Sequence, residues 1–209
     1  MSQDTRQPDE GYVKYHAEHT RAPAPRHPLL AELDAARTEL HDLGLIGIYA
    51  NGIGFGNLSF RTKGNRFVIS GTGTGAKRIL GESGYCLVTA FDADKNRVEC
   101  EGPIRASSEA MTHGAVYAEN PRVQCVIHVH SRALFDSLLA RGWPHTPENA
   151  AYGTPAMAMA IAELVRNTPE DQALFVLAGH DEGLVAYGPS IEKTMRLLIE
   201  TVEGEGAKE

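Results

Sequence analysis

The sequence predicts an α/β fold: a single-domain, three-layer sandwich with a central, mainly antiparallel sheet flanked by helices. Residues 85–90 and 96–100 are strand-like and are joined by the short turn Asp92-Ala93-Asp94-Lys95, as in an antiparallel hairpin. Amphipathic helical stretches alternate with the strand-like segments, which places helices over the faces of the sheet. No internal repeat or linker interrupts residues 29–204, the expected domain. Residues 1–28 are expected to form a polar N-terminal arm, and residues 205–209 a polar tail.

Composition excludes several classes of protein. The 209 residues are enough for one domain with a sizeable core, and the net charge of -7 argues against a nucleic-acid-binding face. The three cysteines, Cys86, Cys100 and Cys125, are odd in number and lie far apart in apolar surroundings, which indicates reduced core residues in a cytoplasmic protein. We find no apolar run of about 18 residues and no apolar signal-peptide core, so neither a membrane span nor a secretory signal is expected.

The expected elements follow from periodicity and from end signals. Three helices are predicted over residues 29–43, from the N-cap Ser107 to Asn120-Pro121, and through residues 134–139. Two more are predicted to begin at Thr154-Pro155 and after the N-cap Ser190. Further strands are predicted at residues 66–69, 123–130, 171–178 and 183–187.

Two histidines end the apolar stretch that begins at Val123. Side chains alternate faces along a strand, so His128 and His130 lie on the same face. Two imidazoles at fixed positions suit a divalent metal, although a pair of this kind is also found as ordinary polar residues at a strand end.

Other candidates for the same site lie elsewhere in the chain. Glu109 stands at the start of a predicted helix that leads into the histidine strand, and His180 lies in the turn between the last two strands. His180 is a candidate third ligand because catalytic zinc commonly has three protein ligands and an open position. On spacing alone, His113 and His145 compete for that place.

Two glycine-rich stretches and a serine pair offer donors for an anion. The stretches are residues 51–56, followed by Asn57, and residues 70–75, which include Thr72; the pair is Ser107-Ser108. Glycine lets backbone N–H groups approach a ligand closely, and a helix start binds phosphate well. Neither glycine stretch fits the dinucleotide fingerprint or the nucleotide P-loop, and each alone is more often a plain hairpin or turn.

These motifs together resemble the class II aldolase and adducin-head family. The resemblance rests on residues 56–61, 69–73, 107–109 and 128–131, and on His180 before Gly183-Leu184, and it spans about residues 29–203. It implies a nine-stranded, largely antiparallel sheet and a fourfold ring with sites at subunit contacts. It also implies that His128, His130 and His180 hold zinc and that Glu109 is the acid/base. The substrate phosphate would be held at positions Gly56, Asn57, Thr72, Gly73, Ser107 and Ser108.

The expected function is therefore that of a metal-dependent aldolase in a homotetramer. It would cleave a small ketose 1-phosphate to dihydroxyacetone phosphate and an aldehyde through a zinc-stabilised enediolate, with no Schiff-base lysine. Mn²⁺, Co²⁺ or Fe²⁺ could replace Zn²⁺ at neutral histidines. Alternatives are a methylthioribulose-1-phosphate dehydratase, another sugar-phosphate lyase or decarboxylase of the family, and an adducin-like oligomerisation module without enzymatic activity.

The sequence departs from the family pattern at three places. Ala106 stands where the family usually has proline. In the family a glycine usually follows the third histidine directly, whereas here Asp181-Glu182 lie between His180 and Gly183. The stretch between His130 and Tyr152 is shorter than in the fuculose-phosphate aldolases of this family and lacks their tyrosine segment. The substrate therefore need not be fuculose phosphate.

Overall fold

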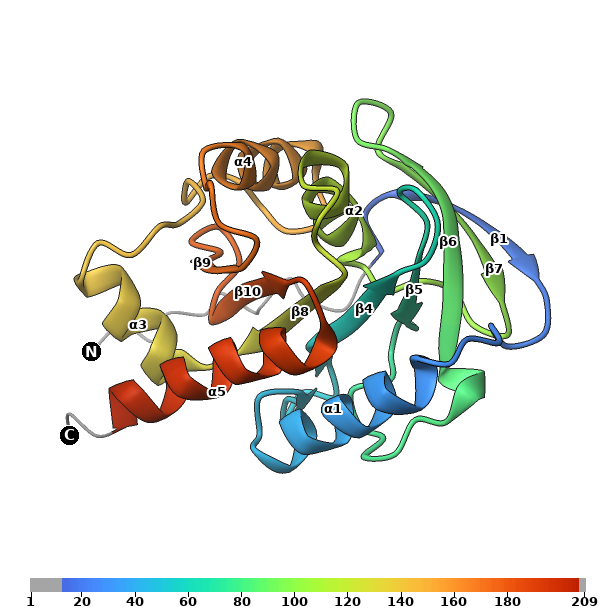
Figure 1. Cartoon of the computed structure of the whole chain (residues 1–209), viewed down its shortest axis with the longest axis horizontal. Coiled ribbons are helices and arrows are strands. Elements are labelled where there is room, and N and C mark those ends of the chain that lie inside the picture. Colours follow the sequence, from blue (N-terminus) through green and yellow to red (C-terminus); the bar gives the residue numbers. More distant parts are fainter. Residues whose placement is uncertain (1–12, 207–209) are drawn as a thin grey trace.

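The computed structural model describes residues 13–206, and the fold is the predicted α/β sandwich (Figure 1). Residues 1–12 of the expected arm and 207–209 of the expected tail lie outside the described part. The main sheet has eight strands in the order β1-β7-β6-β5-β4-β8-β10-β9. In chain order these strands are β1 (His16–Arg21), β4 (Asn57–Arg61), β5 (Phe67–Ser70), β6 (Tyr85–Asp92), β7 (Arg97–Gly102), β8 (Cys125–His130), β9 (Ala173–Val176) and β10 (Gly183–Gly188).

The sheet pairing is antiparallel except between β1 and β7, which run parallel. The resemblance implied nine strands in one sheet, which is wrong for the described residues. Instead β2 (Gly47–Ile48) and β3 (Gly54–Phe55) pair with each other as a separate hairpin. The strand β1 lies within the expected polar arm, where it pairs with β7 of its own chain.

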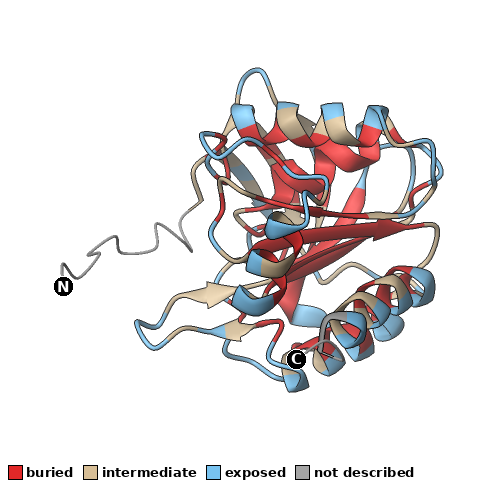
Figure 2. Cartoon of the chain, turned by 90° about the vertical axis from the view of Figure 1, so that its left-hand side faces the viewer, coloured by how far each residue is buried: buried red, intermediate tan, exposed pale blue. Residues whose placement is uncertain are grey.

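Within residues 13–206, five α-helices cover the two faces of the sheet. They are α1 (Leu30–Asp42), α2 (Ala110–Glu119), α3 (Arg132–Ala140), α4 (Pro155–Arg166) and α5 (Ile191–Gly206), with a short 3-10 helix, η1 (Glu82–Gly84). In Figure 1, α2 and α4 lie above the sheet, and α1, α3 and α5 lie below it. Figure 2 shows the strands buried between helices whose outer faces are exposed.

The alternation along β8 divides the core into two layers. Val126 packs in the layer that holds Met111 of α2 and Met157 of α4. Ile127 and Val129 pack in the other layer, against the helices below. His128 and His130 share the parity of Val126, so β8 directs both imidazoles to the side of the sheet covered by α2 and α4.

The helix ends largely follow the expected caps. Thr154 Oγ1 accepts a hydrogen bond from Met157 N, and Ser190 Oγ accepts one from Lys193 N. The expected start of α2 is wrong: the helix begins at Ala110, and Ser107 Oγ instead accepts from Glu109 N at 3.3 Å. The segment 107–109 is therefore a turn that leads into the helix.

The expected burial of the cysteines is confirmed. Cys86, Cys100 and Cys125 are all free thiols in buried positions. Over residues 13–206, every helix is too short or too polar to cross a bilayer.

Candidate metal and anion site

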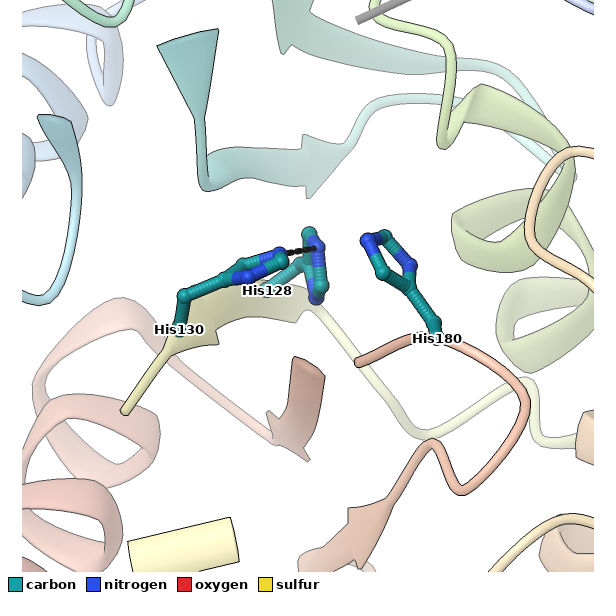
Figure 3. A group of neighbouring side chains, drawn as sticks. All are labelled: His128, His130 and His180. Atoms are coloured by element: carbon teal, nitrogen blue, oxygen red, sulfur yellow. Dashed lines mark hydrogen bonds between the residues drawn. The ribbon is translucent and has the colours of Figure 1, made fainter. Parts of the chain in front are cut away.

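Three histidines meet at one end of β8 (Figure 3). Within this group of His128, His130 and His180, one ring nitrogen from each lies within 4.8 Å of the other two. The Nε2 atoms of His128 and His130 are 3.0 Å apart. His180 reaches them because Gly183, at the start of β10, pairs with His130, while Gly183 N donates to His180 O at 2.8 Å in the preceding turn.

The Asp181-Glu182 insertion is accommodated within that turn. Glu182 adopts a left-handed backbone with φ of 63°, which closes the turn before β10. The two extra residues, Asp181 and Glu182, both form ion pairs with Arg132.

Burial makes the two strand histidines neutral nitrogen donors. Loss of solvent lowers the pKa of His128 and of His130 well below the ordinary value, and the neighbouring imidazoles lower both further. His128 Nδ1 lies 2.9 Å from Leu184 O, which can only accept, so that nitrogen carries the proton and Nε2 presents its lone pair to the group. Three imidazoles with a polar cavity on one side fit a divalent ion with an open coordination position.

Glu109 lies beside the histidines at the entry to α2. Its side chain is 2% exposed, and Oε2 accepts a hydrogen bond from Thr112 Oγ1 at 2.7 Å. Its Oε1 has no hydrogen-bond partner and lies 3.5 Å from His180 Nδ1. A buried carboxylate oxygen left without a donor is costly unless a ligand or an ion supplies a partner.

Both glycine stretches approach each other closely around the cavity. Gly56 has φ of 79°, and a Cβ there would lie 2.5 Å from Ile46 Cγ1. A Cβ on Gly75 would lie 2.8 Å from the Cα of Gly54, in the other stretch, and 2.0 Å from the carbonyl oxygen of Gly47. Only glycine fits at these two positions.

The cavity has a volume of about 190 Å³ and contains every predicted site residue. Its lining includes Gly56, Asn57, Thr72, Gly73, Ser107, Ser108, Glu109, His128, His130 and His180. Among the described residues that line it, none is lysine or arginine. An anion bound there would depend on backbone N–H groups and on hydroxyl and amide side chains.

The two competing histidines lie outside the group. His113 is fully buried, its Nδ1 is 2.7 Å from Ser59 Oγ, and burial lowers its pKa to about 3. His145 is exposed, with Nδ1 2.7 Å from Trp143 O.

Sequence reasoning missed Tyr152, which lines the cavity with its ring 4.6 Å from that of His180. Tyr152 lies in a loop without periodicity, so no sequence pattern indicated its position.

Together these features define an α/β protein with a buried three-histidine pocket beside a carboxylate and two glycine-rich loops. The chain belongs to the Class II Aldolase and Adducin N-terminal domain family, which matches residues 39–204.

Individual known proteins are similar to the chain in sequence or in fold. The chain is 33% identical over 81 residues to 3-oxo-tetronate 4-phosphate decarboxylase of Haemophilus influenzae; the match covers 39% of this chain and 35% of that protein. The fold is similar to YgbL of Escherichia coli, for which aldolase, epimerase and decarboxylase activities have been suggested (TM-score 0.63, 20% identity, 85% and 86% of the two chains). It is also similar to L-fuculose-1-phosphate aldolase of Thermus thermophilus (TM-score 0.54, 22% identity, 87% and 98%).

Proposed function

We propose that the protein is a metal-dependent lyase that breaks a carbon–carbon bond next to a carbonyl in a small phosphorylated sugar. The observation that carries this proposal is one cavity in which three histidine nitrogens lie within 4.8 Å of one another, beside a Glu109 Oε1 atom that has no hydrogen-bond partner and lies 3.5 Å from His180 Nδ1. The chemistry needs a site that stabilises negative charge on oxygen and a group that moves a proton nearby.

His128, His130 and His180 would hold the ion, with Zn²⁺ expected and Mn²⁺, Co²⁺ or Fe²⁺ as alternatives. When bound, a divalent ion supplies a Lewis acid for the charge that develops as the bond breaks. Glu109 would carry the proton at the carbon that loses its bonding partner. Its position at the entry to α2 keeps the carboxylate oxygen within reach of the cavity, and Thr112 holds the other oxygen in place.

The phosphate of the substrate would lie against the glycine loops and the serine pair. Gly56, Asn57, Thr72, Gly73, Ser107 and Ser108 offer N–H, amide and hydroxyl donors. Asn57 is 5% exposed and lines the cavity, and its side-chain NH2 group is the donor that a phosphate would need.

The first candidate reaction is aldol cleavage of a ketose 1-phosphate to dihydroxyacetone phosphate and an aldehyde. The second is decarboxylation of a phosphorylated oxo acid, which the match to the Haemophilus influenzae decarboxylase favours. Both leave an electron pair next to a carbonyl, so the same histidines and carboxylate serve either reaction. They differ in the fragment that departs, an aldehyde or carbon dioxide.

A product screen separates the two reactions. The metal-loaded protein is incubated with a panel of ketose 1-phosphates and with 3-oxo-tetronate 4-phosphate, while triose phosphate and carbon dioxide are measured in parallel. Glu109→Gln should lower kcat by about 10²–10⁴-fold and leave the metal content unchanged. No product from any substrate, together with a metal-free purified protein, would favour an adducin-like module instead.

A further inference from the structure

Tyr49 connects a predicted metal ligand to the Asp181-Glu182 insertion. The residue follows β2, in the hairpin that β3 completes. Its hydroxyl oxygen lies 2.9 Å from His130 Nδ1 and 2.8 Å from Glu182 Oε2. Two residues far apart in the sequence thus contact the same phenol group at the edge of the cavity.

The positions of the protons follow from the donors available. An ionised Glu182 can only accept, so the single hydroxyl proton of Tyr49 is donated to Glu182. The Tyr49 oxygen then accepts from His130, whose Nδ1 must carry the ring proton. His130 Nε2 is left with its lone pair, directed at His128 Nε2 3.0 Å away. Two lone pairs at this distance repel unless a cation lies beside both.

Arg132 holds the Glu182 carboxylate in place. Arg132 Nε lies 3.3 Å from Glu182 Oε1, and Arg132 Nη2 donates to Asp181 Oδ2 at 2.5 Å. The left-handed backbone of Glu182 turns the side chain toward Arg132 and Tyr49. Both inserted acids therefore anchor Arg132, which lies two residues after His130.

Aromatic packing fixes the rest of the arrangement. The ring of Phe55 on β3 lies 4.5 Å from the ring of Tyr49 and 5.4 Å from that of His130. This contact limits movement of both rings, so the hydrogen bonds hold one orientation of the imidazole.

We propose that Tyr49 and Glu182 are positioning residues that fix the tautomer of His130 and so direct its Nε2 lone pair at the metal. This inference rests on the proposed function, because it assumes that His130 is a metal ligand. It gives the Asp181-Glu182 insertion a role in the site, although neither acid lines the cavity.

The test is a cobalt titration of the metal-free full chain, read by visible absorption. Tyr49→Phe should raise the Kd for Co²⁺ by about 10–100-fold, the usual effect of losing a partner of a metal-bound histidine. Glu182→Gln keeps the shape of the side chain but can donate as well as accept, and should raise the Kd in the same direction. The matched control is Tyr85→Phe, which removes a hydroxyl bound to Asp34 Oδ1 at 2.8 Å in a part of the core away from the cavity. It should leave the Kd unchanged.

A second readout reports on the His130 proton itself. In the Co²⁺-loaded wild type, proton NMR should show the paramagnetically shifted Nδ1–H resonances of the bound histidines. One of them should be lost to fast solvent exchange in Tyr49→Phe and retained in Tyr85→Phe. Wild-type affinity and an intact resonance in Tyr49→Phe would overturn the inference and leave the metal site standing. A wild type that binds no Co²⁺ would overturn the metal site as well.

Discussion

Single side chains set the charge of the cavity and its selectivity. The lining contains one carboxylate, Glu109, and no lysine or arginine among the described residues. Neutral donors must therefore offset the charge of a bound phosphate, together with any divalent ion. This composition makes individual hydroxyl groups important for substrate affinity.

Ser108→Ala tests one of these hydroxyls. Loss of a charge-assisted hydrogen bond should weaken binding of a phosphorylated substrate by about 1–3 kcal/mol. KM for the substrate and the inhibition constant of inorganic phosphate should rise together, with metal content unchanged. If neither constant moves, Ser108 does not belong to the phosphate site.

His113 should make the stability of the metal-free protein depend on pH. Burial lowers its pKa from about 6.5 to about 3 in the folded state. Above pH 6.5 the His113 ring is neutral in both the folded and the unfolded chain, so it adds no pH dependence to the free energy of unfolding. Below that value the unfolded chain takes up the proton and the folded chain does not, so the free energy of unfolding falls by about 1.4 kcal/mol per pH unit.

The comparison is with His113→Gln, which cannot titrate. Between pH 6.5 and 5 the free energy of unfolding, measured with urea, should fall less steeply in this variant than in the wild type. Parallel slopes would show that His113 does not contribute, whatever the other histidines do.

At the scale of elements, the site depends on how strand ends and loops are held. Residues 71–75, which line the cavity, belong to a loop, residues 71–78, that is hydrogen-bonded to Arg37 of α1. Arg37 is 1% exposed and donates to Lys77 O at 2.6 Å and to Thr74 O at 2.8 Å. A buried guanidinium that satisfies several carbonyl groups holds the loop in one shape.

Arg37→Met should therefore loosen the loop without touching the histidines. The expected loss is about 2–4 kcal/mol in the free energy of unfolding, because carbonyl groups are left unpaired. KM for a phosphorylated substrate should rise, while the affinity for Co²⁺ stays at the wild-type value. The control is Arg78→Met in the same loop, which breaks an exposed ion pair with Asp42 and should lower the free energy of unfolding much less than Arg37→Met does.

The elements also show what the sequence could and could not predict. The pairing of His128 with His130 on one face follows directly from the two-residue period of a strand. The caps at Thr154 and Ser190 follow from local hydrogen bonding. The predicted start of α2 is too early, because a serine can close a turn before a helix as well as cap it.

The features of the site that local sequence patterns could not predict depend on long-range contacts. The approach of His180 depends on the pairing of β8 with β10 and on a left-handed residue at Glu182, neither of which has a local signal. The contact of Tyr49 with His130 depends on the β2–β3 hairpin, and no local pattern in the sequence places Tyr49 beside His130. The family resemblance supplied the grouping of His180 with the strand pair that spacing alone left open.

For the whole molecule, metal binding should be coupled to stability. A ligand at about 100 times its Kd adds roughly 2.7 kcal/mol to a folded state that alone binds it. For a domain of this size, Zn²⁺ should then raise Tm by about 5–10 °C over the metal-free protein. His128→Ala should abolish this increase and keep the fold, whereas His145→Ala should retain the increase. An equal increase in all three proteins would place the ion elsewhere.

The homotetramer implied by the resemblance stays a prediction, as does a contribution from a neighbouring subunit. The central claim concerns a single chain: three imidazoles from β8 and the β9–β10 turn hold one ion beside Glu109. Crystals of the Zn²⁺-loaded protein, measured by anomalous diffraction at the zinc edge, test it most directly. The account predicts one strong peak about 2.0–2.1 Å from a ring nitrogen of each of His128, His130 and His180. A zinc peak bound elsewhere, with these three rings in contact only with one another, would contradict it.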